Sequence, residues 1–245
     1  MKILTKQKKV LMSGCDHTAR LSIPEFFAGF IDVATEHGDL MGVSSVDLAK
    51  LDLFWVVTKS KIKILRRPEM MQDYSISTWP NTPEILRSIR FCTFIDNTGV
   101  FAQAKTEWIM LKKQTFKPSK TTGIYPIGTD FCDNVAFDEP WVKFDNDFND
   151  FDKEFSYKVK STDIDFSNHM NNVNYIRALF SCLTTEQIEK ADIKELEIHY
   201  KSQCFEGDNL KIRFKMTKEG FTVGFINNGV VAVAINAIAS QFNIL

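Results

Sequence analysis

Hydrophobic and polar positions follow the same order twice along the chain. In each half, apolar residues first recur every three or four positions, which is typical of one face of a helix. These residues are Phe26, Phe27, Phe30 and Ala34 in the first half, and Val173, Ile176, Phe180 and Leu183 in the second. Segments of alternating polarity, rich in β-branched and aromatic residues, follow in both halves and are typical of strands. Each half is therefore predicted to be one helix followed by antiparallel strands.

The predicted elements end at turn and capping signals. The strands cover residues 54–57, 59–65, 74–79, 85–95 and 100–111, and then 155–159, 195–203, 209–217, 221–226 and 230–240. Turns at residues 96–99 and 226–229 lie in matching places. The first helix is predicted to begin with a capping box at Ser22 and Glu25 and to end at Gly38. This repetition predicts a duplicated fold.

Residues 115–152 interrupt the repeated order with prolines and glycines and are predicted to be a linker. The expected organisation is an N-terminal domain over residues 1–114, this linker, and a C-terminal domain over residues 153–245. The fold class is α+β, with each domain an antiparallel sheet wrapped around a central helix.

Composition narrows the function classes. The chain has 245 residues, 44% of them hydrophobic, and a net charge of −1, so nothing global indicates nucleic acid or an anionic membrane. No apolar stretch near the N-terminus is long enough for a signal peptide or a membrane span. The five cysteines and four histidines have no metal-ligand or disulfide spacing. We therefore expect no metal, no cofactor, no membrane insertion and a reducing cytoplasm.

Residues 163–175 carry the densest chemistry. They hold two carboxylates, one imidazole, four carboxamides and two hydroxyls, and the second helix begins directly afterwards. A helix start offers unpaired N–H groups and the positive end of a dipole, which suits a developing oxyanion. A capped helix start with polar decoration is the alternative.

With these residues the chain resembles the acyl-acyl carrier protein thioesterases, which are built from two tandem hot-dog domains. The family signature Asp-x-Asn-x-His-x-Asn-Asn-x-x-Tyr is similar to the series Asp165, Ser167, His169, Asn171, Asn172 and Tyr175. Landmarks of the first half also match, namely 55–58, Arg67-Pro68, 78–80, Arg90, Asp96, Gly99 and Trp108. The resemblance covers residues 10–238.

The resemblance implies a catalytic set with two departures. Asp165 and His169 match the family, whereas Ser167 stands at the catalytic Asn position, beside Asn168, and Gln203 stands at the catalytic Glu position. Asp165 is the candidate base or nucleophile, and His169 is expected to orient it, donate to the carbonyl or shuttle a proton. Ser167 or Asn168 would hold a water that Gln203 orients. A thiol nucleophile at Cys204 is the alternative.

Substrate binding is assigned to two groups of residues. Asn171 and Asn172 lie at the helix start, where backbone N–H groups are placed to polarise a carbonyl. An apolar slot for an acyl chain is expected beside the first helix, lined by Phe26, Phe27, Phe30 and Trp55. Core packing explains the same aromatic residues equally well.

The leading interpretation is an enzyme of fatty acid biosynthesis that hydrolyses fatty acyl-acyl carrier protein to free fatty acid and carrier protein. An acyl-CoA thioesterase and a non-catalytic acyl-thioester-binding protein are the alternatives, and a homodimer is left open. An acidic carrier protein would dock on basic residues. Two runs qualify: a first run of Lys59, Lys61, Lys63, Arg66 and Arg67, and a second run of Lys112, Lys113, Lys117 and Lys120. Solvated charged faces are the simpler explanation of both runs.

Overall fold

The computed structural model describes residues 2–144, 147–240 and 242–244. It forms two compact units, Met1–Glu139 and Pro140–Leu245. The division falls within residues 115–152, so that residues 115–139 belong to the first unit and residues 140–152 to the second.

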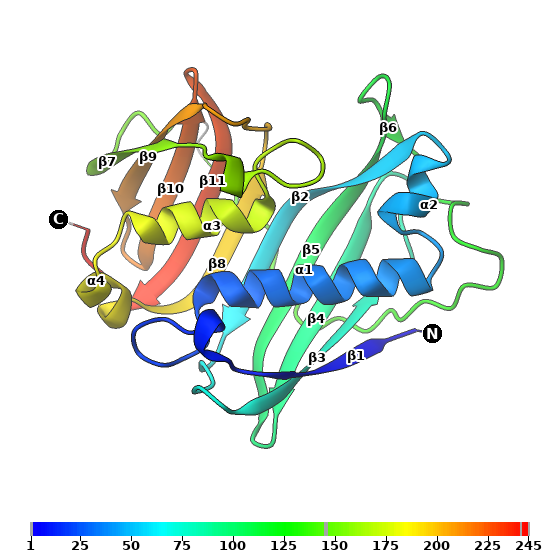
Figure 1. The fold of residues 1–245 in the computed structure, drawn as a ribbon, viewed down its shortest axis with the longest axis horizontal. Coiled ribbons are helices and arrows are strands. Elements are labelled where there is room, and N and C mark those ends of the chain that lie inside the picture. The colour runs from blue at the N-terminus through cyan, green and yellow to red at the C-terminus, as the bar shows by residue number, and fades with distance from the viewer. Residues whose placement is uncertain (1, 145–146, 241, 245) are drawn as a thin grey trace. The chain divides into compact units, whose positions relative to one another are not determined.

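The first unit is an antiparallel sheet with a long helix on one face (Figure 1). Its strands are ordered β1-β3-β4-β5-β2, and the short β6 pairs with β5. The elements are β1 (Leu4–Lys9), the 3₁₀ helix η1 (Met12–Gly14), α1 (Ile23–Leu40), α2 (Ser45–Ala49), β2 (Leu53–Ile64), β3 (Asp73–Pro80), β4 (Ser88–Asp96), β5 (Gly99–Lys112) and β6 (Pro118–Ser119).

Aromatic side chains fill the space between α1 and this sheet. The Phe26 ring lies 5.3 Å from the ring of Phe94 and 6.1 Å from that of Phe101, and Phe27 and Phe30 are buried beside them. Edge-to-face contacts of this kind add to the stability gained from apolar burial. The periodic apolar residues of the sequence thus form the core of the first unit.

The predicted start of α1 at Ser22 is confirmed, whereas the predicted capping box and the predicted end at Gly38 are wrong. Ser22 is the N-cap by backbone conformation, but its side chain makes no capping hydrogen bond. The helix continues through Gly38 to Leu40, and the left-handed residue is Gly42, with φ of +71°. Side-chain capping boxes form instead at Ser44 before α2 and at Thr184 before α4 (Thr185–Lys190).

The two strands predicted at residues 54–57 and 59–65 are one strand, β2. A β-bulge at Thr58 shifts the register against β5 between Val57 and Lys59, and the Thr58 hydroxyl donates to the Glu107 carboxylate at 2.7 Å. A bulge changes which residues face each side of a sheet without ending the strand.

The second unit repeats this plan. Its strands are ordered β8-β11-β10-β9-β7, and α3 lies across them (Figure 1). The further elements are β7 (Lys153–Lys158), the 3₁₀ helix η2 (Ser161–Asp163), α3 (Asn172–Ser181), β8 (Asp192–Tyr200), β9 (Asn209–Met216), β10 (Gly220–Asn227) and β11 (Val230–Ser240). Tyr175 packs edge-to-face on Phe225, with ring centres 5.6 Å apart.

Each unit is therefore a hot-dog fold, and the predicted α+β class with two tandem hot-dog domains is confirmed.

Across the described part of the chain, none of the helices combines the length and the apolar character needed to span a bilayer.

Candidate active site

The polar residues of the motif lie in a tight loop before α3. Ile164 and Met170 form an antiparallel bridge that closes the loop. Inside it, the Asp165 N–H donates to the His169 carbonyl at 3.1 Å, and the Asn168 N–H donates to the Asp165 carbonyl at 3.0 Å. Asn168 adopts a left-handed conformation with φ of +62°, which asparagine tolerates well. The loop therefore joins the backbones of Asp165 and His169 directly.

The two carboxylates of the motif have different roles. Asp163 is buried, and its carboxylate accepts hydrogen bonds from the Tyr157 hydroxyl at 2.9 Å and the Lys160 N–H at 2.8 Å. Its carbonyl accepts from the Asn171 N–H at 2.8 Å. Asp163 thus holds the loop to the start of α3, and this structural role was not anticipated from the sequence.

Asp165 is half-buried, and its carboxylate is accessible to a reactant. One carboxylate oxygen accepts a hydrogen bond from the Ser167 N–H at 2.8 Å, which forms an Asx turn. Ser167 and Asn168 are exposed at the tip of the loop. This arrangement orients the Asp165 carboxylate while leaving its second oxygen for a water or an acyl carbon.

His169 is half-buried, and its Nδ1 lies 3.4 Å from the Met170 carbonyl oxygen. A contact with a carbonyl favours the tautomer that carries the proton on Nδ1, because the carbonyl can only accept. Nε2 is then the atom that can accept a proton.

Hydrogen bonds at the start of α3 leave one backbone donor for a substrate. Asn171 caps the helix: its side-chain oxygen accepts from the Val173 N–H at 2.9 Å, and its carbonyl accepts from the Asn174 N–H at 2.9 Å. Among the described residues, the Asn172 N–H has no acceptor. Of the backbone N–H groups of residues 171–173 that were expected to polarise a carbonyl, only the Asn172 N–H is therefore left as a candidate donor.

The segment after β8 lies against the motif loop. The Met170 N–H donates to the Cys204 carbonyl at 2.8 Å, which places the exposed Gln203 next to the loop. The Cys204 thiol itself is fully buried, and this burial raises its pKa. A buried thiol with a raised pKa is a poor nucleophile, so this environment argues against the thiol alternative.

Unit 1 contains the same loop with different side chains. Cys15 and Leu21 form the closing bridge, the Asp16 N–H donates to the Arg20 carbonyl at 3.0 Å, and the Leu21 N–H donates to the Pro68 carbonyl at 2.9 Å. Asp16 therefore corresponds to Asp165. Because Pro68 corresponds to Cys204, the residue before it, Arg67, corresponds to Gln203.

In this counterpart loop of the first unit, the aspartate is paired with an arginine. Arg67 donates to the Asp16 carboxylate at 2.6 Å and to the Thr18 hydroxyl at 2.9 Å. Arg20 stands where the second unit has His169. In the first unit the carboxylate of this loop is thus bound by Arg67, and its histidine, His17, follows the aspartate directly instead of standing four residues later as His169 does.

Two supporting residues were missed in the sequence. The Tyr200 hydroxyl donates to the Asn172 carbonyl at 3.3 Å, and the Asn227 amide donates to the Asp208 carboxylate at 2.6 Å and lies 3.8 Å from the Cys204 sulfur. Both come from strands of unit 2 that are distant from the motif in sequence. No local pattern could have identified them, because these contacts depend on how the strands pair.

The residues expected to line an acyl slot lie in the first unit. Phe26, Phe27 and Phe30 are core residues there, with at most 2% of their surface exposed. Trp55 donates through Nε1 to the Val43 carbonyl at 3.2 Å, and its ring lies 6.5 Å from that of Trp108. Their role in binding an acyl chain stays a prediction.

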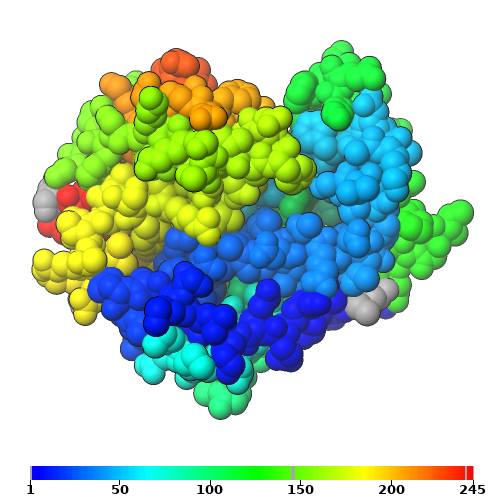
Figure 2. All heavy atoms as spheres, in the orientation of Figure 1, coloured from blue at the N-terminus to red at the C-terminus, as the bar shows by residue number. Residues whose placement is uncertain are grey.

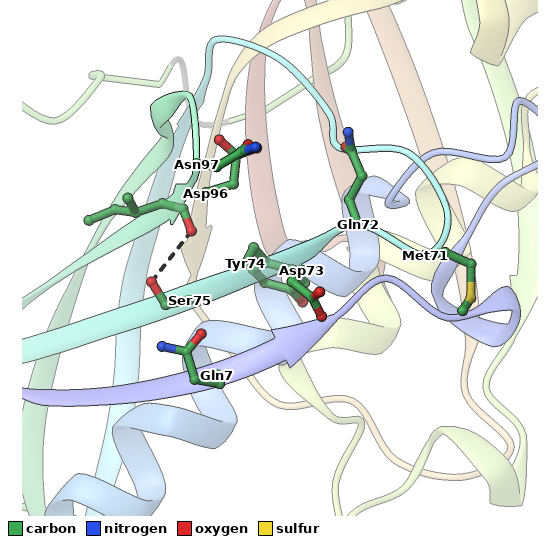
Figure 3. Close-up of a pocket in the computed structure, with 9 residues that line it drawn as sticks. Gln7, Met71, Gln72, Asp73, Tyr74, Ser75, Asp96 and Asn97 are labelled. Carbon is green, nitrogen blue, oxygen red and sulfur yellow. Dashed lines mark hydrogen bonds between the residues drawn. The ribbon is translucent and has the colours of Figure 1, made fainter.

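A surface pocket of the first unit is lined by none of the motif residues. It is lined by side chains at the ends of β1, β3 and β4, among them Gln7, Asp73, Ser75, Asp96 and Asn97 (Figure 3). Its two carboxylates are paired already, Asp73 with Lys9 at 2.6 Å and Asp96 with Arg66. Within the residues described, no group of three or more His, Cys, Asp and Glu side chains is arranged to hold a metal ion.

Both halves of the chain are similar to known proteins. Residues 2–124 match the acyl-ACP thioesterase N-terminal domain, and residues 147–243 match the acyl-ACP thioesterase C-terminal domain. An acyl-[acyl-carrier-protein] hydrolase of Cuphea viscosissima is 26% identical over 204 residues, which are 78% of this chain and 49% of the relative. Oleoyl-acyl carrier protein thioesterase 2 of Arabidopsis thaliana is 24% identical over 198 residues, 72% of this chain and 53% of the relative. The chain thus spans about half the length of these curated relatives.

Solved structures show the same fold. An acyl-ACP thioesterase from Bacteroides thetaiotaomicron has a TM-score of 0.85 at 22% identity and covers 97% of this chain and 98% of its own. The 12:0-ACP thioesterase from Umbellularia californica has a TM-score of 0.85 at 17% identity, covering 97% and 96%. The two domain matches together take in most of the sequence, and this chain therefore belongs to the acyl-ACP thioesterase family.

Proposed function

We propose that this protein hydrolyses fatty acyl-acyl carrier protein and releases free fatty acid and carrier protein. The observation that carries the proposal is the hydrogen-bonded loop of the second unit, which carries a half-buried Asp165 carboxylate and a half-buried His169 imidazole and leads directly into the Asn172 N–H, unpaired among the described residues, at the start of α3. The counterpart loop of the first unit, whose aspartate is paired with Arg67, lacks this equipment.

A thioester needs little help with its leaving group, because the pKa of a thiol is roughly 8.5. The work lies in positioning a nucleophile and stabilising the oxyanion. In the proposed reaction the Asn172 N–H donates to the thioester oxygen. Asp165 either takes a proton from the attacking water or attacks the carbonyl itself, and His169 moves a proton through Nε2. Gln203 orients the water but cannot take its proton, since a carboxamide is not a base.

The first basic run cannot serve as the docking face for a carrier protein. Lys61 is buried, Lys63 is paired with Glu139, and Arg66 is paired with Asp96. Residues 130–139 cover this face of the sheet, where the Phe137 ring lies 5.1 Å from the Lys63 ammonium. The alternation of lysines in β2 therefore reflects a covered sheet face, and the docking prediction for this run is wrong.

The second basic run is the docking face that we propose. Lys112, Lys113, Lys117 and Lys120 are exposed at the hairpin between β5 and β6, and within the described ranges none of them forms an ion pair. Phe116 at the hairpin tip is 60% exposed. The hairpin lies at the surface beside the start of β2, where the Phe116 ring lies 5.9 Å from that of Phe54 (Figure 2). Unpaired lysines around an exposed aromatic ring suit an acidic protein partner.

Charge reversal tests this docking face. Lys113→Glu with Lys117→Glu should raise KM for acyl-carrier-protein substrates about tenfold at low salt, because steering by exposed charges is strongest there. Turnover of the matching acyl-CoA should stay unchanged. Lys8→Glu with Lys218→Glu changes the net charge equally at two other exposed lysines and is the control. Equal effects of both double variants would remove the docking face from the proposal.

Thiol release from a panel of acyl-carrier-protein thioesters and matching acyl-CoAs tests the function. Faster hydrolysis of the carrier-protein forms supports the proposal and gives the preferred chain length. Preference for CoA would retain the chemistry and change the substrate class, whereas binding without release would make this an acyl-thioester-binding protein. We also propose a reducing cytoplasm as the compartment, which the five free cysteines support.

A further inference from the structure

A buried guanidinium lies inside the first unit without a carboxylate partner. Arg90 is on β4, and only 8% of its surface is exposed. Its Nη1 lies 3.0 Å from Nδ1 of His37 on α1 and 3.4 Å from the Thr78 hydroxyl on β3. Within the described residues, Nε and Nη2 have no hydrogen-bond partner. Burial without a counter-anion costs stability, and it lowers the pKa of Arg90 to about 10.

The hot-dog fold does not require a charge at this position. The two units have the same hairpins, with the turn after Asp96 corresponding to the turn after Asn227, so that Arg90 corresponds to Phe221 and Thr78 to Phe214. In unit 2 these two phenylalanines are fully buried, with ring centres 5.8 Å apart. One unit therefore fills this part of its sheet with aromatic rings, and the other fills it with a cation and a hydroxyl.

The polar residues lie at one end of an apolar core. Phe26, Phe27 and Phe30 occupy the first turns of α1, and His37 lies near its C-terminal end. The half-buried Tyr125 side chain lies near Ser88 and Arg90 and completes the polar end. A guanidinium with free N–H groups binds carboxylate oxygens in preference to neutral groups.

We propose that Arg90 forms a subsite in the first unit for an oxygen-bearing end of an aliphatic chain. The aliphatic nature of the ligand rests on the proposed function. Two sources supply this chemistry: the carboxylate of a free fatty acid, and an oxygen function at the far end of an acyl chain. Thr78 and His37 hold the guanidinium through Nη1, and Nε and Nη2 donate to the ligand oxygen.

Calorimetry tests whether the subsite binds the carboxylate of a free fatty acid. It measures the binding of dodecanoate and of methyl dodecanoate to the whole protein. Arg90→Met should weaken dodecanoate at least tenfold and leave the ester unchanged. Hydrolysis of dodecanoyl and 12-hydroxydodecanoyl thioesters tests the second. The hydroxylated substrate should have the higher kcat/KM, and Arg90→Met should remove this preference while retaining turnover of the plain chain.

Two further variants serve as controls for the Arg90→Met measurements. Lys105→Met removes another buried cation of the same unit, on the opposite face of the sheet, and should change neither measurement. Arg90→Lys keeps the charge but loses the planar fork, and it serves if Arg90→Met does not fold. Unchanged binding and unchanged selectivity in a folded Arg90 variant would overturn the subsite. Absence of all hydrolysis would instead contradict the proposed function, and the dodecanoate measurement would still decide the subsite.

Discussion

Two aspartates in the same loop conformation have different partners in the two units. Asp16 is neutralised by Arg67, whereas the equivalent of Arg67 in unit 2 is Gln203, which carries no charge. The Arg67 guanidinium, 2.6 Å from the Asp16 carboxylate, forms a charge-assisted hydrogen bond that a reactant would have to displace. With glutamine at this position, the residue equivalent to Arg67 provides no cation to pair with the Asp165 carboxylate.

Gln203→Glu tests whether this position belongs to the site. A carboxylate there can both orient a water and accept its proton, so turnover should stay equal or rise, by up to about 10²-fold, the low end of general-base effects. Gln203→Ala is the control and should reduce turnover. Steady-state kinetics and a thermal melt of both variants check this. If Gln203→Glu is folded and slower than Gln203→Ala, the residue does not face the reacting water.

Removing the Asp163 carboxylate should lower the stability of the protein, since this carboxylate is hydrogen-bonded within the fold. Asp163→Ala leaves the Tyr157 hydroxyl and the Lys160 N–H without their acceptor, which should lower the free energy of unfolding by about 1–3 kcal/mol. Tyr157→Phe removes one of these bonds and should cost about 1 kcal/mol. Urea unfolding measures both. An Asp163→Ala protein with unchanged stability would contradict the structural role assigned to this carboxylate.

At the scale of elements, extended segments cover sheet faces that the strand pattern alone leaves open. In unit 2, Phe148 packs into a cluster with Ile226, Val231 and Ala234. The ring passes directly over Gly224 of β10, where a Cβ atom would lie 2.4 Å from Phe148 Cγ. Gly224 is thus required by a close approach and not by its backbone conformation.

Gly224→Ala should therefore destabilise the protein by about 1–3 kcal/mol, because the added methyl group displaces the Phe148 ring. In the double variant with Phe148→Ala, the alanine at position 224 should add little further cost, since the clashing ring is gone. Chemical denaturation of the two single variants and the double variant gives this coupling energy. Additive effects would mean that Phe148 does not lie on Gly224.

Covered faces also explain which element predictions failed. Lysine alternation in 59–63 has the period of a strand with one solvated face, yet Lys61 is 2% exposed because residues 130–139 lie over it. Those residues have no periodic pattern, so the sequence offers no sign of where they pack. Similarly, the bulge at Thr58 looks like a break between two strands, because it shifts the alternation by one residue.

At the scale of the whole molecule, the duplicated order of elements was predictable, because each hot-dog unit repeats one helix and the same hairpins. The motif loop was predictable from its polar density. Its internal roles were not: the sequence does not distinguish the structural Asp163 from Asp165, and the contacts of Tyr200 and Asn227 arise only from strand pairing. In the sequence, the aromatic residues on and beside α1 were explained equally well by core packing and by an acyl-binding slot. Their burial in the structure does not distinguish these two explanations.

The duplication also provides an internal control for the central claim that catalysis belongs to the loop of the second unit. Hydrolysis of one acyl-carrier-protein thioester is measured with the wild-type protein, Asp165→Asn and Asp16→Asn, each checked for folding. Asp165→Asn should lose at least 10²-fold in kcat, whereas Asp16→Asn should lose stability, because it weakens the pair with Arg67, and keep turnover. Near wild-type turnover in Asp165→Asn, or an equal loss in Asp16→Asn, would contradict the account.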